Sequence, residues 1–544
     1  MRVAATSDLW WKNAVIYCLD VETYSDSDGD GVGDFAGLTT RLDHLRGLGV
    51  SCVWLMPYFP TPERDDGYDI TDFYGVDSRL GTHGDHVVAL RQAADRGLRV
   101  IADLVVNHTS VEHPWFQAAR RDRNDPRRDW YVWSDTEPET APGDVVFPDA
   151  EDSIWSYDDA AGQWYKHRFY KEQPDLNVDN PAVRDELARV AGFWLQQGLA
   201  GFRIDAVPYF LEAEGRDASG DPHDVMRDLR SFLGRRSGGT VLLGEVNLPR
   251  DQQRAFFGDE DGDELQMLFD FLANQAMYLS LARRDPAPLV EAITGRPVIP
   301  VECQWAVFVR NHDELTLDKL TDDERQEVFA AFGPDESQQL FGRGLRLRLP
   351  TMLGGDQRRM RMVYSLMFSL PGTPVLFYGE EIGLADNPEI PGRQAVRVPM
   401  QWDTGPNAGF SSAPSDRLVA PVATDPAFGP ETVSVAVQRR AGDSLLTWFE
   451  RLIRLRRETP AFGWGTWRRV DVGEPRVLAA RVDWQDETLL VLHNFAADPA
   501  CVTVPGELAG RRLEELFADD RYDDEDGQVD LGPDGYRWFR LTPA

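Results

Sequence analysis

The most constraining feature of the sequence is a series of short apolar segments that alternate with stretches of helical character. Helices are predicted, for example, over Arg41–Leu48, His86–Arg96 and Pro181–Gln197, the last of which begins after Asn180 and ends at Gly198. Strands that alternate with helices form a parallel sheet with crossover helices, and eight such strands close a (β/α)8 TIM barrel of the α/β class. The expected strands are Ala14–Leu19, Cys52–Met56, Val100–Val105, Gly201–Ile204, Val241–Leu243, Met267–Phe271, Ala306–Val309 and Val375–Tyr378.

Three of these strands lead directly into acidic residues. Because the carboxyl ends of barrel strands meet at one face, Asp205, Glu245 and Asp313 are expected to converge there. Arg203 lies two residues before Asp205 on the same face of its strand, and a fixed cation there would keep Asp205 ionised. Three convergent carboxylates can cleave a glycosidic bond: one attacks, one protonates the leaving oxygen and one supports a cationic transition state. A single strand that ends in Asp is more often a capped helix start or a solvated loop, so the interpretation needs all three. The segments are Gly201-Phe202-Arg203-Ile204-Asp205, Leu243-Gly244-Glu245-Val246-Asn247 and Arg310-Asn311-His312-Asp313-Glu314.

Bulk composition excludes several classes of function. The net charge of −34 disfavours nucleic acids and anionic membrane surfaces, whereas a small neutral sugar is compatible with it. No 18-residue apolar run is present, and Met1 to Val15 lacks the apolar core of a secretory signal. The four cysteines have no CxxC spacing, which favours free thiols in a reducing compartment. We therefore expect a cytoplasmic enzyme and leave its oligomeric state open.

The alternation of strand and helix is interrupted once and then ends. A long polar stretch rich in Trp and Tyr runs from His108 to Val178, and a structureless loop of that length is uncommon in a compact domain. It predicts a small inserted domain after the third strand. Beyond Pro460 the pattern changes to short β segments such as Leu489–Asn494 and Trp538–Leu541, which predict an antiparallel β-sandwich. The expected division is residues 1–108 and 179–461 for the barrel, 109–178 for the inserted domain and 462–544 for the C-terminal β-sandwich.

Two further segments strengthen the pattern of the acidic strands: Asp103-Leu104-Val105-Val106-Asn107-His108-Thr109 and Gln173-Pro174-Asp175-Leu176-Asn177. The five segments together, in this order and at this spacing, resemble glycoside hydrolase family 13, the α-amylase family. The resemblance implies a retaining double displacement. In that reaction Asp205 is the nucleophile, Glu245 is the general acid and base, and Asp313 binds sugar hydroxyls and favours the distorted ring.

The same resemblance implies a set of substrate-binding residues. His108 and His312 match the pocket histidines of the family, which hydrogen-bond hydroxyls of the glucosyl ring. Tyr68 is expected to stack under the sugar and Asp69 to accept two hydroxyls. Arg393 resembles the arginine that joins Asp69 in closing an exo-acting pocket.

An acidic loop follows the first expected strand. Oxygen donors at alternate positions, with glycine at the turn, suit a hard cation such as Ca²⁺ or Mg²⁺, and an Asx-rich turn without metal is the alternative. Asn107 and Asp175 resemble the ligands of a second structural calcium in the family, and no organic cofactor is expected. The ligands expected in the loop are Asp26, Asp28, Asp30 and Asp34, with the carbonyl of Val32.

The chain resembles most closely the branch of the family that contains oligo-1,6-glucosidases, α-glucosidases and trehalose synthases. Much of it is similar to the trehalose synthases, but Val246 stands where they have Ala, and Asp270 stands where they have His. These departures favour an exo-acting, retaining α-glucosidase that cleaves α-1,4 bonds of short glucosides, with some transglucosylation. The alternative is a trehalose synthase, an intramolecular transferase that interconverts maltose and trehalose. A non-catalytic scaffold subunit is disfavoured by the intact carboxylates.

Overall fold

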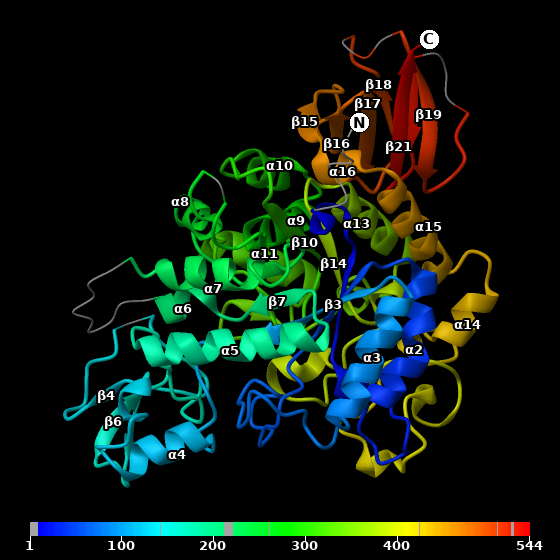
Figure 1. The fold of residues 1–544 in the computed structure, drawn as a ribbon. Coiled ribbons are helices and arrows are strands. Elements are labelled where there is room, and N and C mark those ends of the chain that lie inside the picture. The colour runs from blue at the N-terminus through cyan, green and yellow to red at the C-terminus, as the bar shows by residue number, and fades with distance from the viewer. Residues whose placement is uncertain are drawn as a thin grey trace.

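The barrel predicted from the sequence is present in the structure, which is a computed structural model. It describes residues 9–141, 143–211, 221–260, 262–423, 425–506, 508, 510–523 and 527–543. Eight parallel strands close in the order β1-β14-β10-β9-β8-β7-β3-β2 (Figure 1). They coincide with the eight predicted strands, with ends that differ by at most two residues. Their bounds are Ile16–Leu19 (β1), Cys52–Leu55 (β2), Arg99–Leu104 (β3), Gly201–Ile204 (β7), Val241–Gly244 (β8), Met267–Phe269 (β9), Gln304–Phe308 (β10) and Thr373–Phe377 (β14).

Helices cover the outside of the barrel, and their caps explain where they begin. The predicted helix Pro181–Gln197 (α5) is confirmed: the Asn180 side chain accepts from the Ala182 amide, and Gly198 ends the helix at φ +119°. Two other helices begin earlier than predicted, because Asp34 caps α2 and Thr82 caps α3 with a reciprocal capping box. The bounds of the main helices are Phe35–Leu48 (α2), His83–Asp95 (α3), Asp224–Gly234 (α7), Phe271–Arg283 (α9) and Gln357–Ser369 (α13).

The residues between β3 and α5 form a small unit with its own sheet, as expected for an insertion after the third strand. Helix α4 (Pro114–Arg121) packs on a three-stranded sheet in the order β4-β6-β5, with Phe116 stacked on Trp133 at 5.4 Å between ring centroids. Isolated bridges from His108 to Asp175 and from Tyr131 to Leu176 join its two ends. In Figure 1 this unit lies beside α5, on the side away from α2 and α3. The strands are Trp133–Ser134 (β4), Trp155–Asp158 (β5) and Gln163–Lys166 (β6).

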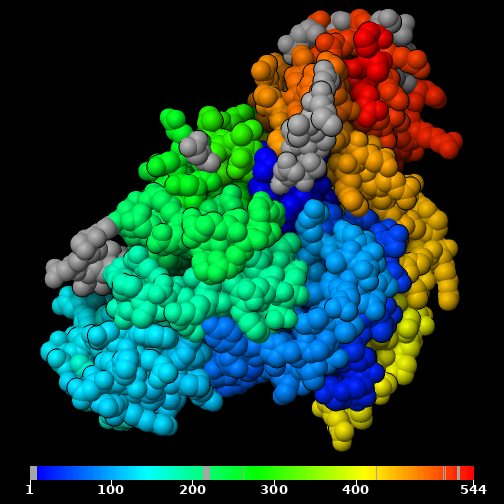
Figure 2. All heavy atoms as spheres, in the orientation of Figure 1, coloured from blue at the N-terminus to red at the C-terminus, as the bar shows by residue number. Residues whose placement is uncertain are grey.

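The C-terminal part contains two antiparallel sheets. Five strands pair in the order β15-β16-β17-β21-β19, and β18 pairs with β20. Apolar residues from both sheets, including Val502, Val529 and Phe539, form one separate core, which fits the predicted sandwich. Helices α15 (Leu445–Glu458) and α16 (Ala461–Trp464) connect it to the barrel, and Figure 2 shows it as a protrusion at one end of the molecule. The strands are Thr466–Val470 (β15), Val477–Trp484 (β16), Glu487–Asn494 (β17), Ala500–Thr503 (β18), Arg511–Ala518 (β19), Gln528–Leu531 (β20) and Tyr536–Pro543 (β21).

The contact between the barrel and the C-terminal sheet is largely apolar and contains buried polar groups. Ser365 on α13 accepts a hydrogen bond from the Trp538 indole at 3.1 Å and lies 3.0 Å from Nε2 of the buried His493.

Within the described ranges, no helix is both long enough and apolar enough to span a bilayer.

Strand β7 begins at a glycine that the barrel requires. Gly201 has φ +153°, and a Cβ there would lie 2.1 Å from the Val241 carbonyl oxygen of β8. We expect Gly201→Ala to destabilise the protein by about 3 kcal/mol or more, since backbone atoms must move apart. Gly47→Ala, on the exposed face of α2 with open space around it, is the control and should be neutral or slightly stabilising. Thermal melting measures both, and an unchanged melting temperature for Gly201→Ala would contradict the argument.

Candidate active site

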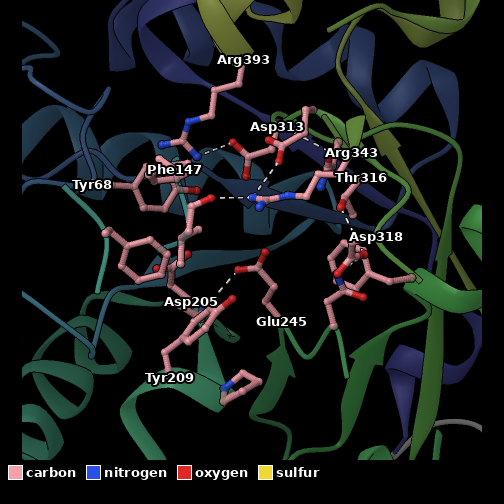
Figure 3. Close-up of a pocket in the computed structure, with 18 of the residues that line it drawn as sticks. Tyr68, Phe147, Asp205, Tyr209, Glu245, Asp313, Thr316, Asp318, Arg343 and Arg393 are labelled. Atoms are coloured by element: carbon pink, nitrogen blue, oxygen red, sulfur yellow. Dashed lines mark hydrogen bonds and ion pairs between the residues drawn. The ribbon is translucent and has the colours of Figure 1, made fainter. Parts of the chain in front are cut away.

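The three acids predicted from the strand ends line a single pocket at the carboxyl face of the barrel (Figure 3). Asp205 follows β7, Glu245 follows β8, and Asp313 lies in the loop after β10. Tyr68 and His108, from the loops after β2 and β3, line the same pocket, which has a volume of about 370 Å³. The predicted convergence is therefore present.

One buried arginine links two of these acids. Arg203, with a side chain only 2% exposed, donates to Asp205 Oδ1 at 2.5 Å and to Glu245 Oε2 at 2.6 Å. It also donates to the fully buried Asp103 at 2.5 Å, and Asp103 in turn accepts from the Trp54 indole at 2.7 Å. Because one planar guanidinium binds both pocket carboxylates, their relative positions are fixed before any sugar binds.

The protonation states of Asp205 and Glu245 follow from their burial and this shared cation. Burial raises the pKa of Asp205 to about 6, and Arg203 limits the rise. Burial raises the pKa of Glu245 to about 7, where Arg203 lowers it and the nearby Asp205 and Asp313 raise it. At a pH between these values the pair holds one ionised carboxylate and one carboxylic acid, as a nucleophile and an acid require.

Asp313 is held differently, by donors on both of its oxygens. Its Oδ1 accepts from Arg393 at 2.7 Å and from Arg397 at 2.9 Å, and His312 Nε2 lies 3.2 Å from Oδ2. Burial acts to raise the pKa of Asp313, but the charges of Arg393 and Arg397 outweigh it and hold the pKa well below its usual range. Asp313 therefore stays ionised while Glu245 carries a proton.

The expected pairing of Asp69 with Arg393 is wrong. Arg393 pairs with Asp65, which lines the pocket, whereas Asp69 is fully buried. Asp69 turns into its own loop, where it accepts from the Thr61 hydroxyl at 2.7 Å and from the backbone amides of Arg64 and Asp65. The loop donors satisfy both oxygens of Asp69, so the structure assigns closure of this end of the pocket to Asp65. The sequence placed an acid at both positions and carried no local signal to choose between them.

The two predicted histidines have different positions. His108 lines the pocket and lies 3.2 Å from the Tyr68 carbonyl oxygen through Nε2. His312 is 1% exposed and is not among the described residues that line the pocket. Its Nε2 lies 2.8 Å from the Tyr68 hydroxyl, and its ring stacks on that of Tyr68 at 5.7 Å. Burial lowers the pKa of His312 to about 3, so a neutral ring supports Tyr68 and Asp313 from behind.

Two segments distant in sequence meet over the pocket, and sequence reasoning missed both. Gly143, Val145, Val146 and Phe147 of the insertion line the pocket. So does Arg343, from the loop that joins β12 (Gln339–Leu340) to β13 (Gly344–Leu345), and Phe341 lies in the same loop. Arg343 donates to the Val146 carbonyl at 2.7 Å, and Phe147 packs on Phe341 at 5.4 Å and under Arg393 at 5.1 Å. We call this pair of segments the cover.

The wall beyond Glu245 is built around Asp318. Its Oδ1 accepts from Asn247 at 3.0 Å, from Gln275 at 3.0 Å and from Thr316 at 3.3 Å, and its Oδ2 binds Lys319 at 2.9 Å. Four partners therefore hold this carboxylate in the wall of the pocket.

The two departures from the trehalose synthase pattern lie away from the pocket. Val246 is fully buried in the apolar core, and Asp270 caps α9 and pairs with Arg296 at 2.5 Å. Neither belongs to the described residues that line the pocket. The side chain next to Glu245 therefore changes the packing behind the acid and not the surface that a sugar would contact.

The acidic loop after β1 brings three of its four carboxylates together. Carboxylate oxygens of Asp26, Asp28 and Asp34 lie within 4.8 Å of one another, which fits a hard cation. Asp30 turns to the Val32 amide at 2.8 Å instead. Asp26 and Asp34 also accept backbone amides of the loop and of α2, so metal binding here remains a prediction.

The second predicted metal site has a different local structure. Asn107 donates to Asp175 Oδ1 at 2.9 Å, and the same oxygen accepts from the Arg168 amide at 3.0 Å. Among the described residues, no third His, Cys, Asp or Glu groups with these two. The structure thus gives this pair a direct role in joining the insertion to the barrel, and a calcium there stays a prediction.

Comparison with known proteins identifies the class. Residues 19–331 and 342–465 match the family described as alpha amylase, catalytic domain, and residues 468–538 match the maltogenic amylase C-terminal domain. The chain belongs to the α-amylase family, as the resemblance implied.

Within the family, the chain is similar to trehalose synthases and to a trehalulose synthase. A trehalose synthase/amylase, TreS, of Mycobacterium tuberculosis is 40% identical over 98% of this chain and 90% of its own length. A trehalose synthase of Thermus thermophilus is 41% identical over 98% of this chain and 56% of its own length. Among solved structures, a trehalulose synthase mutant aligns with a TM-score of 0.80 at 26% identity, covering 98% of this chain and all of that one.

These relatives overturn the expectation of an exo-acting α-glucosidase. Oligo-1,6-glucosidase of Bacillus cereus is only 26% identical, far below the trehalose synthases. The expectation depended on Val246 and Asp270, and it failed because neither side chain reaches the pocket.

The pKa values of the acid pair predict a bell-shaped pH profile. kcat/KM should rise through about pH 6 as Asp205 loses its proton and fall above about pH 7 as Glu245 loses its own. Initial rates on an α-glucoside across pH 4 to 9 measure this profile, with stability followed in parallel as the control. A rate that still rises above about pH 8 would contradict the assignment of Glu245 as the acid.

The loop of Asp26, Asp28 and Asp34 predicts that metal removal affects stability and not chemistry. A cation that binds only the folded state stabilises it by about 2.7 kcal/mol at a hundredfold excess over the dissociation constant. Chelation should therefore lower the melting temperature with little change in kcat at 25 °C, and added Ca²⁺ should restore it. Asp26→Asn should remove the response to the chelator. A melting temperature that ignores both chelator and Ca²⁺ would favour a metal-free turn.

Proposed function

We propose that the protein isomerises maltose and trehalose by intramolecular transfer of an α-glucosyl group, in a retaining double displacement. The observation that carries this proposal is the 40% identity to trehalose synthases over nearly the whole chain, combined with a complete carboxylate triad in one pocket. The substrate class, small neutral α-glucosides, also agrees with the strongly acidic protein surface.

In the first step Asp205 attacks the anomeric carbon and forms a glycosyl ester, while the bond from that carbon to the leaving oxygen breaks. Glu245 gives its proton to the leaving oxygen, so that free glucose forms next to the ester. Arg203 supports both roles, because it binds Asp205 and Glu245 through different nitrogens. Asp313, kept ionised by its two arginines, stabilises the positive charge that develops on the ring.

In the second step the retained glucose turns within the pocket. Its anomeric hydroxyl attacks the glycosyl ester, Glu245 takes the hydroxyl proton, and trehalose forms as Asp205 is released. No water is consumed, so the outcome depends on keeping glucose in and water out. The cover of Phe147, Phe341 and Arg343 and the rigid wall around Asp318 support this retention.

Product analysis on maltose tests the proposed function. We expect trehalose as the main product with little free glucose, and the reverse reaction from trehalose to maltose. Glucose that accumulates at two molecules for each maltose, with no trehalose, would show a hydrolase. Adding labelled free glucose supplies the control, because an intramolecular transfer incorporates little label.

Replacing the nucleophile should abolish turnover. In Asp205→Asn the amide keeps the shape of the side chain but cannot form the ester, so kcat should fall by about 10⁴-fold or more. Circular dichroism and melting should show a folded protein. Activity within about tenfold of wild type would remove Asp205 from this role.

Glu245→Gln should lose activity selectively. Nitrophenyl α-glucoside has a leaving group that needs no proton, so formation of the glycosyl enzyme should persist, while reaction on maltose should be lost. A burst of nitrophenol measures the first step directly. Equal losses on the two substrates would contradict the role of Glu245 as general acid.

A further inference from the structure

The loop after β2 carries two adjacent acids, and each binds a different arginine. Asp65 pairs with Arg393, and Asp66 pairs with Arg397. Both arginines then donate to the same oxygen, Oδ1 of Asp313. The position of one pocket carboxylate is therefore set by two neighbouring residues of one short loop.

Asp66 belongs to a different surface from Asp65. Among the described residues, Asp65 and Arg393 line the pocket, whereas Asp66 and Arg397 do not. Asp66 lines a smaller cavity between the loops after β1 and β2. Asp66 would therefore influence a bound substrate indirectly, through the position of Arg397 and of Asp313.

The backbone at Asp66 is unusual. Its φ of +50° lies in the left-handed region, which residues other than glycine adopt uncommonly. Such conformations cost about 1–3 kcal/mol and persist where the contacts of the surrounding structure hold them in place, often next to functional groups. In this conformation the side chain pairs with Arg397 and also accepts a hydrogen bond from Glu22.

Arg397 is fixed on three sides. Its side chain is 2% exposed; Nε donates to the His312 carbonyl at 2.8 Å, one terminal nitrogen binds Asp66 and the other donates to Asp313 at 2.9 Å. Because the guanidinium is planar and rigid, loss of Asp66 at one edge would let the whole group rotate and would disturb its hydrogen bond to Asp313. One terminal nitrogen of the guanidinium therefore anchors the group to Asp66, and the other positions Asp313.

The charges behind Asp66 show that it keeps its own negative charge. Oxygens of Asp20, Glu22 and Asp66 lie within 4.8 Å of one another, and buried carboxylates so close cannot all ionise. Burial raises the pKa of Asp20 to about 7 and raises that of Glu22 well above its usual range. Burial also acts to raise the pKa of Asp66, but Arg397 outweighs it and the pKa is lowered. Below about pH 7 the protons of the cluster therefore reside on Asp20 and Glu22, and Asp66 is ionised.

We propose that Asp66 is a positioning residue: it holds Arg397 in the orientation that fixes Asp313, without itself touching substrate. The proposal rests on the retaining α-glucoside chemistry described above, and it does not depend on whether the product is trehalose. Asp313 acts on the positive charge of the transition state, which is weaker in the bound substrate. Misplacing it should therefore lower kcat more than it raises KM.

Two variants test this, because they treat the backbone differently. Asp66→Asn keeps the side-chain shape and tolerates a left-handed conformation, whereas Asp66→Gly removes the carboxylate and relieves the backbone. On nitrophenyl α-glucoside we expect kcat to fall by about tenfold to a hundredfold in both, with KM changed by less than about threefold. The control is Asp72→Asn, an exposed acid in the same loop that accepts from the Tyr74 amide at 2.9 Å, and it should behave as wild type.

A double variant tests the route through Arg397. If Asp66 acts only through that arginine, Asp66→Asn should have no further effect on kcat in an Arg397→Gln background. If kcat of the double variant falls by the product of the two single-variant losses, the two residues act independently and the proposal is overturned. A kcat within about twofold of wild type in both Asp66 single variants would overturn it too. Loss of the folded protein in both would assign Asp66 a structural role and overturn it equally. If wild type cleaves the nitrophenyl substrate but makes no trehalose from maltose, the proposed function fails while this test remains decisive.

Discussion

The buried cation of Arg203 is the interaction on which the rest of the site depends. A guanidinium inside a barrel is costly unless carboxylates surround it, and here Asp103, Asp205 and Glu245 do so from three consecutive strands and their ends. Strands β3, β7 and β8 pair so that Asp103, Arg203 and Leu243 are in register. A slip of one residue would turn Arg203 out of the barrel, and the register of these strands therefore determines the geometry of the catalytic carboxylates.

Much of the fold and the centre of the site could be predicted from the sequence, because both depend on local patterns. Apolar strands that end in Asp205 and Glu245 are contiguous signals, and the convergence of their ends follows from barrel geometry. The partner of Arg393 could not be predicted in this way. Asp65 and Asp69 are both acids in one loop, and only the three-dimensional hydrogen bonds of Thr61 and the loop amides show which of them is already satisfied.

Long-range contacts were also invisible in the sequence. Phe147 and Phe341 are almost two hundred positions apart, and neither lies in a recognisable motif, yet they pack together over the pocket. The error about function has a related cause. Val246 is adjacent to Glu245 in sequence, but in a strand end adjacent side chains point in opposite directions, and Val246 points into the core. Closeness in the chain was a poor guide to closeness in the pocket.

The cover has a consequence for how this type of enzyme can diverge. Its two halves belong to an insertion and to a separate hairpin. They meet through the hydrogen bond from the Arg343 side chain to the Val146 carbonyl and through the contact of Phe147 with Phe341, not through the triad. Substitutions there change these contacts and leave the carboxylates in place. Under the proposed function, the ratio of isomerised to hydrolysed sugar depends on residues outside the triad, and single substitutions in these two loops can change it without loss of catalytic power.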